Sequence, residues 1–399
     1  MQLTFDADVE AFRAELVAFL DEHLPSEAEA LERSRSSSHI PEWARHWQRL
    51  MFDNGWLLPG YQAEFGGRNA TLLQQYVHQQ ELARRRAYLT FNPQGVGIIS
   101  ASLISFGTPE QQRRWAVPIL RAEMTASLGM SEPGAGSDLA SLSSRAVRAG
   151  DDFVVTGQKV WTSGAHDADV LLTFVRTDPN APKHKGISAL MIPTDLPGVV
   201  RRPFASACDQ ADLDFNEVFF NDVRVPAENL IGPLNEGWRV ASGSLGHERN
   251  MLWLSYADRL QELVEDFHPS TVLERDRYAT LVMDNQAPRL LGSVALARAA
   301  RGGGCGRPVG AQAVRLRGLA ERVRARVERL RGRQPCPSEH VGPLLSVPPR
   351  PIQGRLVRAL SPFVRRHHRR RYFRSPAQHH CPASAGLAPK LRNNHVHRL

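Results

Sequence analysis

The chain has 399 residues, which is enough for two or three domains with a sizeable hydrophobic core. It contains no run of about 18 apolar residues, no basic and apolar leader at its start, and no Cys-x-x-Cys spacing among its four cysteines. Composition therefore argues against a membrane span, a secretory signal, a zinc site and a disulfide framework. We expect a cytoplasmic protein that holds no metal.

The net charge of +9 is unevenly distributed. Residues 301–399 hold 22 basic and 3 acidic residues, a net charge of +19, whereas residues 1–300 hold 28 basic and 38 acidic residues, a net charge of −10. A block this basic is typical of a nucleic-acid-binding arm. The aromatic side chains of the tail are only Phe363, Tyr372 and Phe373, too few to stack along a single strand, so we expect no nucleic-acid partner.

Helical patterns occupy the first third of the chain. Apolar residues recur at helical spacing over residues 6–23, 41–51, 71–85 and 94–106. A further helix is expected to begin at Thr108, because a threonine cap followed by proline at the first helical position is a typical helix start.

Strand patterns follow from residue 125 to about 232. Residues 141–147 and 152–156 alternate around the turn at 149–151 and predict a hairpin. Residues 170–175 and 187–193 predict two more strands, and residues 215–226 have the period-2 alternation of a half-buried strand. Helices are expected to resume after Gly237-Trp238.

Two polar segments flank the predicted hairpin. Residues 129–138 read Gly-Met-Ser-Glu-Pro-Gly-Ala-Gly-Ser-Asp, and residues 157–164 read Gly-Gln-Lys-Val-Trp-Thr-Ser-Gly. Glycines allow the backbone to approach a flat or anionic group, hydroxyls and backbone N–H groups donate hydrogen bonds, and Trp161 offers a face for stacking. Both segments would converge on one ligand, for which a flavin ring and pyrophosphate are suitable. The alternative is a Gly-Ser turn beside a core tryptophan.

The two segments resemble the flavin-binding signatures of the acyl-CoA dehydrogenase family. The Trp56-x-x-Pro59 and Phe65-Gly66-Gly67 pattern also resembles that family, and the resemblance covers roughly residues 1–300. It implies an α+β fold with an N-terminal helical domain, a small central β domain and a C-terminal helical bundle. It also implies bound FAD.

The resemblance implies specific contacts to the cofactor. Met130 and Ser131 would contact the flavin edge, and Trp161, Thr162 and Ser163 would flank the ring, with Ser163 near its reactive nitrogen. Leu128 and Gly136 complete the expected cofactor site. Ser137 would contact either a flavin phosphate or the acyl-CoA.

The catalytic base is expected on the helix after the β domain. In the family the base is either a late Glu before Gly-Thr or a Glu that immediately precedes Arg on this helix, and Glu248-Arg249 resembles the second arrangement. A buried carboxylate with a raised pKa suits removal of the α-proton of an acyl-CoA. His247 and Arg249 would then line the substrate pocket. The alternative is an ordinary ion pair on the helix surface.

The family resemblance ends near Gly304. Codons for residues 366–381, chosen within degeneracy and read one nucleotide later, can spell Ala-Thr-Ile-Ala-Gly-Gly-Thr-Ser-Glu-Val-Gln-Arg-Asn-Ile-Ile-Ala, which resembles the closing motif of the family. The same shift lets Val309–Ala313 read Ser-Val-Leu-Lys-Leu, so we infer a shifted reading frame. In that frame the residue before Gly-Thr is encoded by GNC and is not Glu, which favours Glu248 as the base.

The expected domains are residues 1–122 (helical), 123–235 (β, with the flavin loops), 236–304 (start of the C-terminal helical domain) and 305–399 (an aberrant Arg/Pro-rich tail, poorly ordered). The expected function is FAD-dependent α,β-dehydrogenation of an acyl-CoA of fatty-acid or steroid side-chain type. Its electrons would pass to an electron-transfer flavoprotein or similar acceptor, and an intact bundle would form a dimer or tetramer of like or unlike chains. The alternatives are a catalytically dead relative that lacks the C-terminal bundle and an Arg-tailed nucleic-acid binder.

Resequencing of the DNA across codons 295–315 tests the shifted frame. We expect the raw trace either to show an inserted or deleted base, or to confirm the printed sequence with a family-like continuation in the next frame. If the sequence stands and that frame holds no such continuation, the frameshift explanation is wrong.

Overall fold

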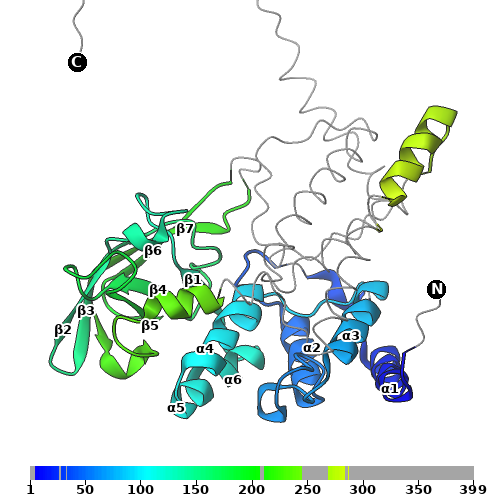
Figure 1. The fold of residues 1–399 in the computed structure, drawn as a ribbon, viewed down its shortest axis with the longest axis horizontal. Helices are drawn as coiled ribbons and strands as arrows, with labels where there is room; N and C mark the ends of the chain where they lie inside the picture. Colours follow the sequence, from blue (N-terminus) through cyan, green and yellow to red (C-terminus); the bar gives the residue numbers. More distant parts are fainter. Residues whose placement is uncertain are drawn as a thin grey trace, which may run out of the picture. The chain divides into compact units, whose positions relative to one another are not determined.

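The computed structural model describes residues 5–26, 28–32, 34–206, 211–244, 268–283 and 286. The expected base at Glu248 and the tail after residue 304 lie outside this part. The predicted helical domain and central β domain are both confirmed (Figure 1). The domain boundaries at residues 122, 235 and 304 stay predictions.

Helices form the N-terminal part, and all five expected helices are present. The helical elements up to residue 120 are α1 (Ala7–His23), η1 (Glu29–Leu31), α2 (Glu42–Asp53), η2 (Ala63–Phe65), α3 (Leu72–Arg84), η3 (Gly95–Ile99), α4 (Ser100–Phe106), α5 (Pro109–Gln111), η4 (Gln112–Ala116) and α6 (Val117–Leu120). η3 and η4 are π-helical turns that continue directly into α4 and α6. The helix start at Thr108 is confirmed, because its hydroxyl accepts from the Gln111 N–H while the Gln111 side chain accepts from the Thr108 N–H.

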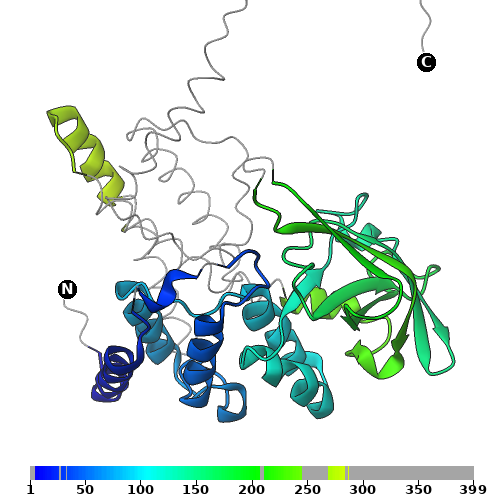
Figure 2. The same cartoon turned by 180° about the vertical axis from the view of Figure 1, so that it is seen from behind.

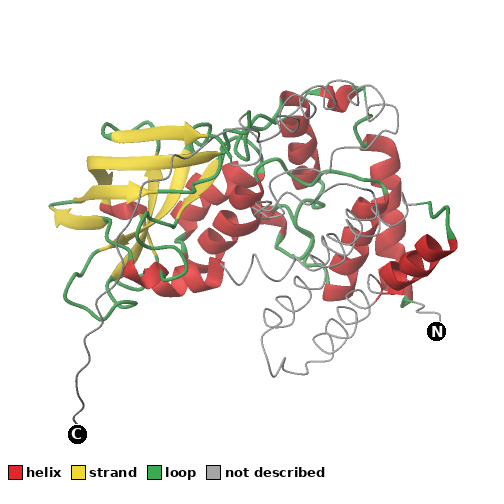
Figure 3. Ribbon diagram, turned by 90° about the horizontal axis from the view of Figure 1, so that it is seen from above, coloured by secondary structure: helices red, strands yellow, loops and turns green. Residues whose placement is uncertain are grey.

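Strands follow in one sheet, whose strands are yellow in Figure 3. They are β1 (Ala126–Gly129), β2 (Arg145–Ala149), β3 (Asp152–Lys159), β4 (Val170–Arg176), β5 (Ile187–Pro193), β6 (Val199–Phe204), β7 (Phe215–Pro226) and β8 (Leu230–Ile231). Among the described residues the sheet has eight strands in the order β6-β7-β3-β2-β4-β5-β8, and β1 pairs with β4 in parallel. β2 also pairs with β4 in parallel, where Arg145 faces Arg176, and the remaining strand pairings are antiparallel.

The predicted hairpin is present but begins later than expected. β2 pairs with β3, Ala149 faces Asp152, and Gly150 between them has φ +65°, a conformation that favours glycine. Residues 141–144 precede β2 and are not part of it, whereas residues 157–159 belong to β3 and not to a loop. The strands β1, β6 and β8 were not expected, because they are short or carry basic residues and proline, and only pairing with distant strands extends them.

The sheet buries both of its faces at β4 and β5. Leu172, Phe174 and Met191 lie in one hydrophobic cluster, while Leu171 and Ile192 lie in a second cluster on the opposite face. This double burial explains the nearly uninterrupted apolar runs of these two strands. The alternating run of β7 has the half-buried pattern expected of it.

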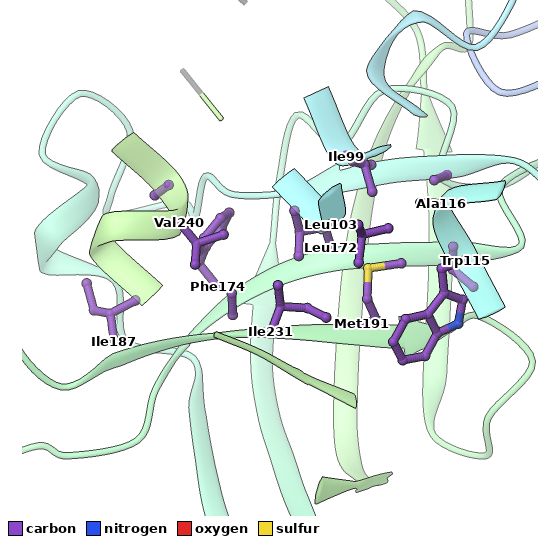
Figure 4. Close-up of a cluster of buried hydrophobic side chains, with 14 of the residues drawn as sticks. Ile99, Leu103, Trp115, Ala116, Leu172, Phe174, Ile187, Met191, Ile231 and Val240 are labelled. Atoms are coloured by element: carbon purple, nitrogen blue, oxygen red, sulfur yellow. The ribbon is translucent and has the colours of Figure 1, made fainter. Parts of the chain in front are cut away.

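The first cluster joins the sheet to the helices. Figure 4 shows Ile99, Leu103 and Trp115 from η3, α4 and η4 next to Leu172 and other side chains of the sheet. The helix at residues 237–244 adds Val240 to the same cluster, which confirms that helices resume after the sheet. Figures 1 and 2 show α4 and α6 between the sheet and the helices α1 to α3. Among the described helices, none is long and apolar enough to cross a membrane.

A buried histidine makes the helical part sensitive to acid. His78 of α3 is 4% exposed, stacks on Trp56 with an interplanar angle of 7°, and has no hydrogen-bond partner for Nε2 among the described residues. Burial lowers the pKa of His78 to about 4, and a hydrogen bond with the Trp56 backbone opposes this shift only in part. His78 is therefore neutral in the fold at neutral pH.

We expect His78→Phe to flatten the pH dependence of stability. The folded-state pKa lies below the unfolded value, so this contribution is fully present above about pH 6.5 and is lost as the pH falls towards 4. At pH 5 protonation of His78 should lower the free energy of unfolding of the wild type by about 2 kcal/mol, a loss that the variant does not show. Urea unfolding at pH 7.5 and pH 5 measures this difference. His46→Phe at an exposed position of α2 is the control, and an unchanged pH dependence in His78→Phe would contradict the prediction.

Candidate cofactor and active site

The two polar segments predicted from the sequence meet at one place. The Val160 N–H donates to the Ser131 carbonyl at 2.9 Å, and the Ser127 hydroxyl donates to the Ser163 carbonyl at 2.5 Å. The first segment follows β1 and the second follows β3, so the ends of two strands carry the loops (Figure 1). The predicted convergence is therefore observed, although the ligand contacts of these residues stay predictions.

A buried ion pair lies beneath the loops. Lys159 Nζ contacts Glu132 Oε1 at 2.7 Å, and the two side chains are 0% and 3% exposed. Lys159 Nζ also donates to the Met130 carbonyl at 3.3 Å. Glu132 accepts from the backbone N–H groups of Ser143 and Ser144, at 2.6 and 3.0 Å. The pair thereby joins the first loop, the end of β3 and the entry to β2.

The two charges of this pair depend on each other. Burial alone would raise the pKa of Glu132, but the Lys159 ammonium and the hydrogen bonds from Ser143 and Ser144 outweigh burial and lower it. Burial lowers the pKa of Lys159, and Glu132 opposes that shift. Each charge is satisfied only while the other is present.

Trp161 is the exposed aromatic of the site. Its side chain is 61% exposed, and it packs edge-on against Phe204 and Phe215, with ring centroids at 5.1 and 5.6 Å. Its φ of +60° is uncommon for a non-glycine residue and is typical of functional loops. The alternative of a core tryptophan is therefore wrong.

Thr162 and Ser163 are buried beside Trp161. The Thr162 N–H donates to the Asn216 carbonyl at 3.2 Å, and the Asn216 N–H returns a bond to the Thr162 carbonyl at 3.1 Å. The Thr162 hydroxyl is buried and finds no hydrogen-bond partner among the described residues. A buried hydroxyl without a partner costs free energy, so this oxygen is suited to a ligand.

The remaining residues of the predicted cofactor site lie at the end of β1 and along the first loop. Leu128 and Met130 are half-buried against the first hydrophobic cluster, and the Leu128 N–H donates to Gln94 Oε1 at 3.1 Å. Ser131 is half-buried, whereas Gly136 and Ser137 are exposed. A Cβ built on Gly136 would have no heavy atom within 4 Å, so the protein itself does not require glycine there. The open space is available to a ligand.

The sequence-based reasoning missed two polar residues of this site. Asn216 is fully buried on β7 and also donates from its side chain to the Thr162 carbonyl at 3.1 Å, and Ser127 is fully buried on β1. One signal was present, because Asn216 falls on the same alternating face of β7 as Val218 and Phe220. A polar side chain on an inward strand face marks a specific hydrogen bond.

The proposed base and its neighbours lie outside the described residues. This applies to Glu248, His247 and Arg249, so the roles predicted for these residues stay predictions.

Comparison with known proteins identifies the family. A model of the acyl-CoA dehydrogenase N-terminal domain matches residues 6–123, and a model of the acyl-CoA dehydrogenase middle domain matches residues 127–223. The chain belongs to the acyl-CoA dehydrogenase family. These proteins are FAD-dependent enzymes. The Thr162 hydroxyl, which has no hydrogen-bond partner among the described residues, and the exposed Trp161 ring beside it fit such a cofactor.

Individual relatives match about two thirds of the chain. Acyl-CoA dehydrogenase IpdE1 of Mycobacterium tuberculosis is 38% identical over 266 residues, which are 65% of this chain and 68% of that protein. Acyl-CoA dehydrogenase FadE26 of the same organism is 35% identical over 256 residues, 62% of each chain. The solved structure of the Tcur3481-Tcur3483 steroid ACAD is 31% identical with a TM-score of 0.67, over 82% of this chain and 85% of that chain.

We expect Lys159→Met to destabilise the protein by about 3–5 kcal/mol, because it leaves the Glu132 carboxylate buried without its cation. The double variant Glu132→Gln/Lys159→Met should be clearly more stable than the single variant, since it removes both charges. Urea unfolding of the full chain measures both changes.

Lys183→Met is the matched control. Lys183 makes a 2.9 Å pair with Asp138, but both side chains are more than 60% exposed, so its loss should cost no more than about 1 kcal/mol. Equal losses for the two lysines would contradict the prediction.

Proposed function

We propose that this chain catalyses FAD-dependent α,β-dehydrogenation of an acyl-CoA thioester to the 2-enoyl-CoA. The observation that carries the proposal is the meeting of two polar loops at an exposed Trp161 ring and a buried Thr162 hydroxyl that has no partner in the part of the chain that the structure describes. A flat, polar ring would suit both side chains, because the Trp161 ring offers an apolar face for stacking and the Thr162 hydroxyl can form a hydrogen bond.

We assign the cofactor-holding roles to the two loops. Trp161, Thr162 and Ser163 would flank the flavin ring, Leu128, Met130 and Ser131 would contact its edge, and Gly136 and Ser137 would lie where the first loop leaves room for a phosphate or the acyl-CoA. Bound FAD would supply the acceptor for the hydride that leaves the β-carbon of the substrate.

The proton chemistry is assigned to Glu248. Its carboxylate would take the α-proton, which the thioester acidifies, as the Cα–H electron pair becomes the second bond of the Cα=Cβ double bond. His247 and Arg249 would bind the substrate. These roles rest on the resemblance of the Glu-Arg pair to the family and on its position after the β domain.

The relatives support a proposal for the substrate class and the partners. The 31% identical neighbour is named as a steroid ACAD, which supports an acyl-CoA of steroid side-chain type beside a fatty acyl-CoA. A 28% identical neighbour with a TM-score of 0.56 is the ChsE4-ChsE5 complex of Mycobacterium tuberculosis, which supports an oligomer of like or unlike chains. We also propose an electron-transfer flavoprotein as the acceptor.

A defective relative is the second candidate function. The composition after residue 304 and the family-like reading of the next frame favour it, because the late part of the family sequence is absent from the printed chain. Such a protein would keep both flavin loops and fail to turn over.

Anaerobic mixing with an acyl-CoA tests the proposal. The purified full chain should show visible flavin absorbance that bleaches on addition of a fatty acyl-CoA or steroid side-chain CoA thioester. Glu248→Gln should keep the flavin but slow bleaching by at least about 100-fold, because it removes the general base.

Glu228→Gln is the matched control, since Glu228 is an exposed carboxylate that pairs with Arg114 at 2.7 Å, and it should bleach at the wild-type rate. Wild-type protein that binds flavin but does not bleach with either thioester would favour the defective relative. Bleaching that Glu248→Gln leaves intact would exclude Glu248 as the base.

A further inference from the structure

A short serine-rich segment lies against the second flavin loop. Residues 34–39 read Ser-Arg-Ser-Ser-Ser-His, and Ser36, Ser37 and Ser38 are only 6%, 3% and 2% exposed. Three consecutive buried serines require hydrogen-bond partners. We call residues 34–39 the serine strap.

The serine strap binds two aspartates of the β domain. Arg35 contacts Asp167 through two nitrogens, with Nη2–Oδ1 at 2.6 Å and Nε–Oδ2 at 3.1 Å, and the Ser36 hydroxyl donates to Asp167 at 2.8 Å. The N–H and hydroxyl of Ser37 both donate to Asp214 Oδ1, at 2.6 and 2.9 Å. These bonds span more than 130 residues of sequence and are charge-assisted, which makes them stronger than neutral hydrogen bonds.

The same aspartates hold the backbone of the loop at residues 161–164. The Gly164 N–H donates to the Asp214 carbonyl at 2.7 Å, and the Asp167 N–H donates to the Gly164 carbonyl at 3.0 Å. The side chain of Asn216 donates to the Asp214 carbonyl at 2.9 Å and to the Thr162 carbonyl at 3.1 Å. Each aspartate thus bonds the serine strap with its carboxylate and the loop with its backbone.

Steric contact at Gly164 adds a second constraint. Gly164 has φ +67°, and a Cβ built on it would lie 2.6 Å from both the N and the Oγ of Ser38. The loop therefore lies too close to the serine strap for any side chain at this position.

The serine strap also contacts the strand that leads into the first loop. Asn92 Nδ2 donates to the Ser37 carbonyl at 3.0 Å and to the Ala126 carbonyl at 2.9 Å, while the Ala126 N–H donates to Asn92 Oδ1 at 2.9 Å. One segment of the N-terminal domain thereby contacts the supports of both flavin loops.

We propose that the serine strap is a positioning element for the cofactor site. Through Asp167 and Asp214 it holds Trp161, Thr162 and Ser163 in the conformation that receives FAD. This inference rests on the proposed function for its ligand, but the ordering of the loop can be measured without FAD. Ser37 and Arg35 are positioning residues in this account, because their hydrogen bonds to the β domain go to the aspartates and not to the loop itself.

Hydrogen exchange of the full chain tests the proposal. Ser37→Ala should speed amide exchange in residues 160–168 at least about tenfold, since it removes a hydrogen bond to a carboxylate, and Arg35→Gln should act in the same direction. Peptides from α1 to α3 should keep the wild-type rate. Ser37→Thr retains the hydroxyl and should restore most of the protection.

Two variants serve as controls. Ser26→Ala removes a serine whose hydroxyl bonds only the nearby Glu29, at 2.7 Å, and Arg113→Gln removes an exposed arginine that pairs with Glu110 at 2.9 Å. Neither should change exchange at residues 160–168. Unchanged exchange in Ser37→Ala, or faster exchange throughout the protein, would overturn the proposal.

FAD titration separates this inference from the proposed function. Ser37→Ala should weaken FAD binding by about tenfold. The resolved visible absorption bands of the bound flavin should broaden. The KM for the substrate should change less than the affinity for FAD. If the wild type binds no FAD, the proposed function fails while the exchange result still decides the role of the serine strap. If the wild type binds FAD and Ser37→Ala binds it equally well, the serine strap does not position the cofactor site.

Discussion

The ion pair between Glu132 and Lys159 is the constraint on which the rest of the site depends. Lys159 ends a strand and points inward, where an ammonium group is tolerated only beside a carboxylate. Glu132 of the first loop supplies this carboxylate and also accepts hydrogen bonds from the N–H groups of Ser143 and Ser144, which precede β2. The positions of the first loop, the hairpin and the second loop are therefore set by the same two buried charges.

The sheet provides a rigid support for these loops. β4 and β5 are buried on both faces of the sheet. The π turns and helices between residues 95 and 120 pack on one of these two faces. A core shared by helices and strands resists movement of one relative to the other, because close-packed interiors have few alternative arrangements. The candidate site lies in the loops at the strand ends, where chemistry can vary without disturbing the core.

Polar contacts between distant segments complete the site. Thr162 and Ser163 belong to the loop after β3, yet their backbone bonds go to β7 and β1, and the serine strap reaches the same loop from before α2. The unusual φ angles of Trp161 and Gly164 persist because these partners surround the loop. Within the described residues, the arrangement leaves the Trp161 ring exposed and the Thr162 hydroxyl without a hydrogen-bond partner, which is the chemistry expected of a cofactor site.

The sequence by itself determined the elements whose signals are local. Helical spacing, the Thr108-Pro109 start and the alternation around Gly150 predicted the helices and the hairpin, because each depends on residues close along the chain. The two polar segments could also be identified from the sequence, since their glycines, hydroxyls and tryptophan lie within short runs.

Only the tertiary structure decided which residues support that site. The Glu132–Lys159 pair, the role of Asn216 and the contacts of the serine strap join residues that are 27 to 177 positions apart. No local pattern encodes such partners. A buried polar group needs a hydrogen-bond partner, but the residues next to it in the sequence do not show which distant residue that partner is. The short strands β1, β6 and β8 exist for the same reason, since their hydrogen bonds come from strands elsewhere in the chain.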